Sequence, residues 1–176
     1  GNYFLMVSNH WSGDIVPFKD GGYLFSPASR SYIDIQSDTY NQGYTSSLIA
    51  PEISVQGNGV TINDEDNLPS LTDYTEVGSV PVAGGSISHI FTIQNTVGGN
   101  LNLPGSPKVT ISGAHASNFS VTAQPSSPVA AASSTTFSIV FDPDATGMRT
   151  ATISIASNDT NENPYNFSIR GMGGDY

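Results

Sequence analysis

The sequence contains no cysteine, which removes a whole set of structural and chemical devices. Without thiols the chain cannot form a disulfide framework, a thiolate nucleophile or a cysteine-based zinc site. No apolar run approaches the roughly 18 residues that a membrane-spanning helix needs, and no secretory signal pattern follows Gly1. We therefore expect a chain without membrane insertion, either a soluble fragment or a processed mature protein.

Charged residues are also scarce, and basic ones are scarcer than acidic ones. They make up 11% of the 176 residues, and five Lys and Arg against fifteen Asp and Glu give a formal net charge of −10. Such a surface potential repels phosphate backbones and anionic lipids. Nucleic acid and membrane surfaces are therefore disfavoured as partners, while the length allows one domain or two small ones.

Turn-forming residues are abundant, with eighteen Gly and eleven Pro, and helical periodicity is missing. This composition favours a turn-rich all-β protein. From about residue 77 onward, and at Ile53 and Val55 before it, apolar side chains alternate with period two. Seven or eight such strands predict an immunoglobulin-like antiparallel β-sandwich. Its predicted core consists of Phe91, Ile93, Phe137, Ile139, Phe141, Ile153, Ile155, Phe167 and Ile169.

The first fifty residues differ from the rest in aromatic content. They hold nine of the seventeen aromatic residues, which places a boundary near Pro51 and divides the chain into residues 1–50 and 51–176. "NYFLMVSNHW" and "SYIDIQS" read as strands, and "PFKDGGYLFSP" reads as a hairpin with its turn at Asp20-Gly21-Gly22. About fifty residues without disulfide or metal seldom fold alone. We expect this small aromatic-rich β segment to be part of another domain or a docking and assembly element.

Several stretches of the second part carry a family resemblance. They are "PEISVQGNG", "INDEDNLPSLTDYTEVGSV", "FTIQNTVGGNLNL" and the run from "VTISG" to "SIRGMG". Through them residues 51–173 resemble the choice-of-anchor D domain, a bacterial extracellular immunoglobulin-like repeat related to the abnormal-spindle/hydin and major-sperm-protein sandwiches. The resemblance implies a non-catalytic spacer or interaction module in a secreted or cell-surface protein.

The acidic stretch after the first strand of this domain is the strongest candidate for an ion site. Calcium takes six to eight oxygen ligands, and Asn63, Asp64, Asp66 and Asp73 can supply several of them. Their spacing does not match an EF-hand loop. The alternative interpretation is a solvated turn with Asx-type hydrogen bonds. Two possibilities therefore stay open, namely that the loop binds calcium and that the protein has no cofactor.

Other polar clusters are more typical of turns and packing than of catalysis. "SNDTNENP", which contains Asp159 and Glu162, reads as a hairpin loop. The histidines at positions 10, 89 and 115 lie on different predicted elements, and His89 is expected to be a packed or edge residue of its strand. No nucleophile-elbow or H-E-x-x-H pattern is present, so we expect no enzymatic activity.

Aromatic side chains near Asp and Asn are the usual means of stacking on sugars. Trp11, Tyr23 and Tyr32 are therefore the candidate glycan-binding residues, with core packing as the alternative. Two functions follow from these observations. The first is a non-enzymatic extracellular structural or interaction module that associates with itself, as a fibre or oligomer subunit, or with a neighbouring domain. The second is a carbohydrate-binding adhesin or accessory module that uses the N-terminal aromatic residues.

Overall fold

The structure is a computed structural model that describes residues 7–19, 22–36 and 43–175. The chain divides into two compact units, Gly1–Ile49 and Ala50–Tyr176. No helix among the residues described is long and apolar enough to cross a membrane.

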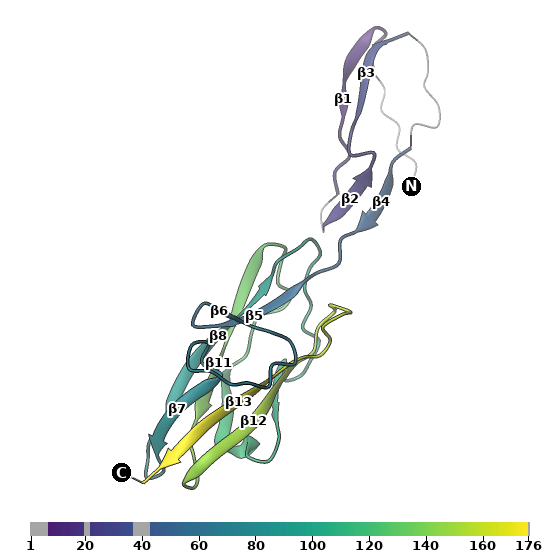
Figure 1. Cartoon of the computed structure of the whole chain (residues 1–176). Coiled ribbons are helices and arrows are strands. Elements are labelled where there is room, and N and C mark those ends of the chain that lie inside the picture. The colour runs from purple at the N-terminus through teal and green to yellow at the C-terminus, as the bar shows by residue number, and fades with distance from the viewer. Residues whose placement is uncertain (1–6, 20–21, 37–42, 176) are drawn as a thin grey trace. The chain divides into compact units, whose positions relative to one another are not determined.

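The second unit is a sandwich of two β-sheets (Figure 1). One sheet contains β5 (Ile53–Gly57), β6 (Val60–Ile62), β8 (Ile87–Asn95), β10 (Phe119–Ala123) and β11 (Ser133–Phe141). The other contains β7 (Glu76–Pro81), β9 (Val109–Ser112), β12 (Gly147–Ile155) and β13 (Tyr165–Gly174). A short 3-10 turn, η1 (Ala116–Asn118), precedes β10.

In space the strands follow the orders β10-β11-β8-β5-β6 and β7-β13-β12-β9. Neighbours are antiparallel except β7 and β13, which run parallel. These nine strands confirm the predicted all-β, immunoglobulin-like sandwich, with slightly more strands than the seven or eight expected.

Period-two patterning builds the core between the two sheets. In β8, β11, β12 and β13 every second side chain is buried over much of the strand. Each fully buried large apolar side chain contributes about 1.5–3 kcal/mol relative to an exposed one. The predicted core is confirmed, because none of its members is more than 1% exposed: Phe91, Ile93, Phe137, Ile139, Phe141, Ile153, Ile155, Phe167 and Ile169.

Apolar residues on the edge strands and at strand ends are less well covered. Ile111 of β9, Val121 of β10 and Ile87 at the start of β8 are only partly buried, although they pack against the same core. β9 and β10 each have a neighbour on one side only within their sheets. The core of the sandwich is therefore fully covered at its centre and partly exposed along the edge strands β9 and β10.

Gly57 at the end of β5 positions the acidic loop that follows β6. A Cβ atom at this position would lie 1.8 Å from the carbonyl oxygen of Asp73, so a side chain cannot be accommodated without moving the loop. The side-chain amide of Asn58 also donates to the carbonyl of Thr72 at 3.1 Å. The loop is therefore fastened to the turn between β5 and β6.

The first unit consists of two antiparallel two-stranded ribbons. β1 (Trp11–Ile15) pairs with β3 (Arg30–Ile35), and β2 (Tyr23–Ser26) pairs with β4 (Thr45–Leu48). The hydroxyl of Tyr44 donates to the carbonyl of Ile15 at 2.8 Å, and Arg30 Nη2 donates to the carbonyl of Gly43 at 3.0 Å. These bonds join the ribbons, yet no side chain described in this unit is fully buried.

The strand pairing that the hairpin prediction for "PFKDGGYLFSP" implied is wrong. β2 pairs with β4, which follows it by about twenty residues, and not with the residues just before it. A turn signal is local, whereas the partner of a strand depends on which edges the rest of the chain leaves free. Asp20 and Gly21 of the predicted turn, and residues 1–6 of the strand predicted in "NYFLMVSNHW", lie outside the residues described. The strand predicted in "SYIDIQS" is confirmed by β3.

Candidate functional site

The acidic loop after β6 uses its carboxylates to bind backbone amides. Asp64 Oδ1 accepts the N–H of Asn166 on β13 at 2.7 Å. Asp66 Oδ1 accepts the N–H two residues further along the loop at 2.9 Å. Asp73 is 6% exposed, and its Oδ1 accepts the N–H and the hydroxyl of Thr75 at 3.0 and 2.6 Å. Each carboxylate thus holds a different part of the loop in place.

The four predicted calcium ligands Asn63, Asp64, Asp66 and Asp73 are not brought together. Asn63 contributes its backbone carbonyl to the N–H of Asp66 at 3.1 Å, as in a local turn. Within residues 7–19, 22–36 and 43–175, a group of three acidic side chains suited to a metal ion is found at another place. The loop has the geometry of the alternative interpretation, a turn with Asx-type hydrogen bonds. Calcium binding by these residues stays a prediction that this geometry does not favour.

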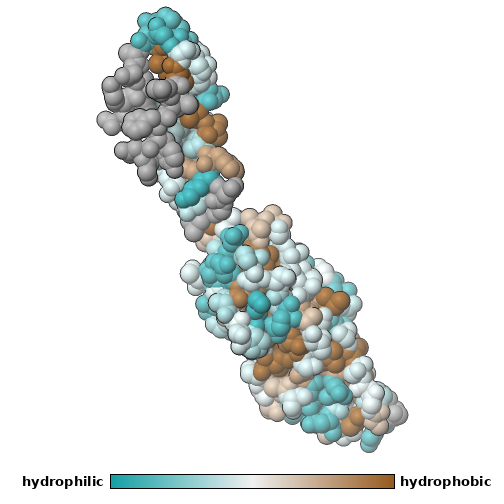
Figure 2. All heavy atoms as spheres, turned by 180° about the vertical axis from the view of Figure 1, so that it is seen from behind, coloured by the Kyte–Doolittle hydropathy of each residue, from teal (hydrophilic) through white to brown (hydrophobic). Residues whose placement is uncertain are grey.

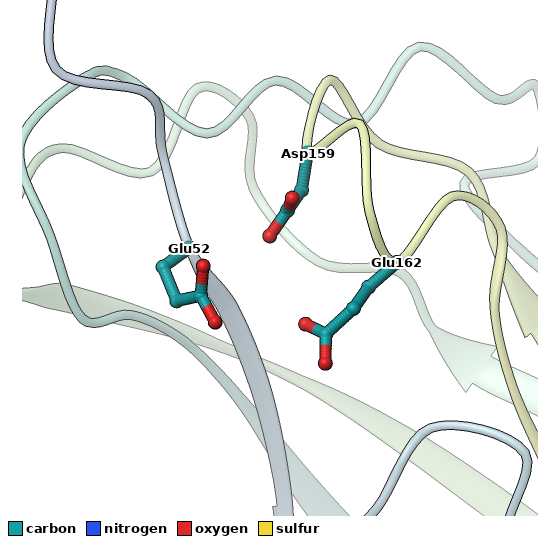
Figure 3. Close-up of side chains that lie close together, drawn as sticks. All are labelled: Glu52, Asp159 and Glu162. Atoms are coloured by element: carbon teal, nitrogen blue, oxygen red, sulfur yellow. The ribbon is translucent and has the colours of Figure 1, made fainter.

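Three carboxylates converge between the start of β5 and the loop that joins β12 to β13 (Figure 3). Glu52 immediately precedes β5, and Asp159 and Glu162 lie in the loop. One carboxylate oxygen from each residue lies within 4.8 Å of those of the other two. We name Glu52, Asp159 and Glu162 the carboxylate cluster.

Asp159 is held in the cluster by backbone hydrogen bonds. It is 1% exposed, and its Oδ2 accepts the N–H of Ile53, the first residue of β5, at 2.9 Å. Its own N–H donates to Ser157 Oγ at 3.1 Å, and the N–H of Ser157 donates to Asn163 Oδ1 at 3.0 Å. Polar side chains of the loop therefore satisfy its backbone groups and fix the buried carboxylate against the other sheet.

Glu162 is the member of the cluster whose surroundings least suit a negative charge. Its Oε2 atom is buried and has no hydrogen-bond partner. Burial raises the pKa of Glu162 above its ordinary value, and the negative charges of Glu52, Asp159 and Asp64 raise this pKa further. The cluster can therefore take up positive charge, either as a proton or as a cation.

The carboxylate cluster was missed by sequence reasoning, although two of its three members lie in one acidic stretch. The acidic residues in "SNDTNENP" indicated a polar loop, which the structure bears out. Nothing in the local pattern shows that this loop lies against Glu52, about a hundred residues earlier in the chain. The only available signal was the position of Glu52 beside a predicted strand of the same domain.

The candidate glycan-binding residues occupy two places in the first unit. Trp11 of β1 and Tyr32 of β3 lie side by side, with ring centroids 6.2 Å apart and ring planes tilted by 43°. The indole covers Gly13, where a Cβ atom would lie 2.6 Å from the ring. Tyr23 is on the other ribbon, with the Nζ atom of Lys19 3.9 Å from its ring centroid. The structure thus offers one aromatic pair and one separate tyrosine, all partly buried.

The three histidines have separate partners. His89 of β8 stacks on Tyr74 with ring centroids 4.1 Å apart, and its Nε2 lies 3.1 Å from the carbonyl oxygen of Val77. His10 Nδ1 contacts Asp34 Oδ1 at 2.5 Å on an exposed part of the first unit. His115 Nδ1 accepts the N–H of Thr150 in the sandwich at 3.1 Å. His89 therefore occupies the packed position expected of it.

A shallow groove of about 460 Å³ lies between the edge strands β9 and β10. Its apolar lining includes Val109, Ile111 and Phe119. The side chain of Gln124 also lines the groove, and its Oε1 accepts the N–H of Val109 at 2.9 Å while its Nε2 donates to the carbonyl of Val109 at 3.2 Å. This side-chain amide takes the place of a neighbouring strand at that point.

Comparisons with known proteins do not assign the chain to a family. No family model and no curated protein matches the sequence. A protein of unknown function from Porphyromonas gingivalis W83 shares 15% identity over 90% of this chain and 83% of its own length, with a TM-score of 0.44. The ASH / PapD-like domain 7 of human CEP192 shares 12% identity over 82% of this chain and 99% of its own length, with a TM-score of 0.43. Likenesses of this degree carry no functional argument, and the choice-of-anchor D resemblance stays a prediction.

Proposed function

We propose that this chain is a non-enzymatic structural and interaction module of a secreted or surface protein of bacteria, and that copies associate through the first unit. The observation that carries the proposal is the apolar surface of that unit. Four large hydrophobic side chains are each between 60% and 87% exposed: Val16, Phe18, Leu24 and Ile33. Hydrophobic residues also appear at the surface in Figure 2.

The backbone of the first unit supports the same proposal. Within the part that the structure describes, each of its four strands pairs with one neighbour. Each strand therefore has a second edge with no strand partner among the residues described, where another strand can add. An isolated two-stranded ribbon is at best marginally stable in water. Association that covers the apolar side chains and pairs the edges stabilises the unit.

The sandwich acts as the stable carrier in this proposal, because it has a continuous core of its own. The extracellular location rests on the choice-of-anchor D resemblance of residues 51–173. The sandwich holds eleven of the fifteen acidic residues and three of the five basic ones, so its surfaces repel one another and contact through the first unit is the favoured route of association.

Light scattering over a range of concentrations tests the association. The double variant Phe18→Ser, Ile33→Ser removes two of the most exposed apolar side chains from the first unit. We expect wild type to shift from monomer to oligomer as concentration rises and the variant to stay monomeric. Ile90→Ser, which changes a residue of the sandwich strand β8 that is 61% exposed, is the control. A monomeric wild type at all concentrations contradicts self-association.

Glycan binding is the second candidate, favoured by the proximity of Trp11 and Tyr32 on one ribbon. Two neighbouring aromatic rings can stack on the face of a sugar through the parts of the rings that solvent reaches. A glycan array with wild type and Trp11→Ala tests it, with Tyr23→Ala as the control from the other ribbon. Binding that Trp11→Ala abolishes and Tyr23→Ala preserves supports a sugar site at the pair. An array without signal removes this candidate.

A further inference from the structure

The groove between β9 and β10 has a backbone edge that can take a further strand. Gln124 lines the groove and bonds both the N–H and the carbonyl of Val109, so these backbone groups point toward the groove. In an antiparallel pair the backbone groups of every second residue point to the same side. Those of Ile111 therefore also point toward the groove and away from β12, the neighbour of β9 in its sheet. A strand that enters here can pair with Ile111 and cover the apolar lining.

The groove belongs to a stretch of the sandwich that is almost free of charge. Residues 77–141, which include β8, β9, β10 and β11, contain no Asp or Glu and one basic residue, Lys108. Lys108 stands between Pro107 and Val109, which both line the groove. All eleven acidic residues of the second unit lie outside this stretch. An acidic partner therefore meets the least repulsion from the sandwich at this groove.

One stretch of the first unit matches the groove in its side-chain pattern. Asp14, Val16 and Phe18 are exposed, and the residues between them are partly buried. Val16 is 67% exposed and Phe18 is 85% exposed, so one face carries a carboxylate followed by two apolar side chains. Pro17 has no N–H to donate, but in an extended chain its backbone points to the opposite side from that of its two neighbours. It therefore does not interrupt pairing through Val16 and Phe18.

The order of the charges selects the direction in which this stretch fits. Lys108 lies at the end of the groove where β9 begins. Asp142 lies toward the other end, because its N–H donates to the carbonyl of Asn118, the residue before β10, at 2.9 Å. A segment that runs parallel to β9 brings Asp14 toward Lys108 and Lys19 toward Asp142. The reverse direction brings like charges together at both ends.

We infer that residues 14–18 of one copy enter the groove between β9 and β10 of the next copy as an added strand. Val16 and Phe18 cover the apolar lining, and Asp14 pairs with Lys108. This inference rests on the proposed self-association and names the surface that receives the first unit. Because the entering segment and the receiving groove are different surfaces, the contact is head-to-tail and adds copies one after another.

Ser120→Glu tests the groove by light scattering over a range of concentrations. Ser120 is exposed and lines the groove, so a glutamate there fits the fold and places a negative charge where Asp14 and the apolar side chains enter. We expect the concentration at which oligomers form to rise about tenfold or more, since like charges across an interface and a charge on a strand edge both oppose pairing.

Ser88→Glu is the matched control and should associate as wild type does. The strand registers pair Ser120 with Val140 and Val140 with Ser88, so the two exposed serines lie in the same row of one sheet. Ser88 is on β8, two strands away from β10. Circular dichroism melting curves verify that both variants fold.

The outcomes separate this inference from the proposed function. A monomeric wild type at all concentrations overturns both. If the double variant Phe18→Ser, Ile33→Ser prevents association while Ser120→Glu associates as wild type does, the first unit docks at another surface. In that case only the groove is overturned.

An exchange of charges tests the pairing of Asp14 with Lys108 without altering the groove lining. Asp14→Lys and Lys108→Glu should each raise the association concentration about two- to fivefold, as expected for loss of an exposed ion pair. The variant that carries both changes should return toward the wild-type concentration, because each copy then offers the exchanged pair to the next. A combined variant that associates more weakly than either single variant overturns the inference.

The absence of cysteine allows the contact to be trapped directly. Val16→Cys chains are mixed with Ser120→Cys chains at a concentration where wild type associates, with oxidised glutathione as the oxidant. We expect disulfide-linked heterodimers, identified by intact mass, and a much lower yield when Ser88→Cys replaces Ser120→Cys. Equal yields for the two serine positions overturn docking in the groove.

Discussion

Phe91 and Phe137 lie opposite each other on β8 and β11, with ring centroids 5.3 Å apart and an angle of 16° between the ring planes. Phe167 from the other sheet approaches Phe91 to 6.0 Å between centroids. The first contact joins two strands of one sheet, and the second joins the two sheets. All three side chains are almost completely buried, so this group of rings is the centre of the sandwich core.

Phe137→Ala should lower the free energy of unfolding by about 3–5 kcal/mol, because it removes buried area and leaves a cavity between the sheets. Denaturant unfolding followed by circular dichroism measures the change. Val60→Ala, at an exposed position of β6, is the control and should cost much less. A loss below about 1 kcal/mol for Phe137→Ala would show that this face is not core.

Gly57→Ala should destabilise the sandwich, although it adds only a methyl group. The new Cβ atom would collide with the backbone carbonyl of Asp73, which cannot move without displacing the acidic loop. We expect a loss of about 1–3 kcal/mol in denaturant unfolding, typical of overpacking. The neighbouring substitution Gln56→Ala should be tolerated, and equal stability of the two variants would contradict the close approach.

Asp73→Ala tests whether the acidic loop is held by its own hydrogen bonds. The substitution removes the acceptor for the N–H and hydroxyl of Thr75, which are buried in the fold. Leaving buried donors unsatisfied costs about 1–3 kcal/mol. Asp144→Ala removes an exposed carboxylate from another turn and should have little effect. If both variants melt at the wild-type temperature, the loop does not depend on Asp73.

Tyr165→Phe should destabilise the sandwich by about 1–3 kcal/mol, because the buried carbonyl of Ile62 loses its donor. Phenylalanine keeps the ring and its packing, so the change isolates the hydroxyl group. Thermal or denaturant unfolding at pH 7 measures the difference. Tyr44→Phe, which removes a hydroxyl from the first unit, is the control that should leave the sandwich transition unchanged.

The same tyrosine predicts an alkaline limit to stability. Burial, with the nearby charge of Glu162 next in importance, raises the pKa of Tyr165 to about 12. A raised pKa means that stabilisation present below about pH 10 is lost as the pH rises toward 12. Absorbance titration of the tyrosines should show one late-ionising group that disappears in Tyr165→Phe. A titration in which all tyrosines ionise near 10 would contradict this.

Much of the sandwich follows from local sequence because alternation is a local property. Successive side chains of a strand point to opposite faces of the sheet. The alternation of Ile153 and Ile155 with polar residues therefore predicts a buried face even when the partner strand is unknown. Turn residues between such runs then separate the strands. The same reasoning failed for "PFKDGGYLFSP", because the partner of β2 lies beyond the next strand.

The sequence by itself thus determined the all-β class, the sandwich core and the acidic character of the loop after β6, since each depends on residue type and short-range order. Only the tertiary structure decided which carboxylates meet. It turned Asp64 and Asp73 to separate backbone partners and brought Asp159 and Glu162 against Glu52. The physical reason is that strand pairing and sheet packing join residues about a hundred positions apart, and no local pattern encodes which of them share a place.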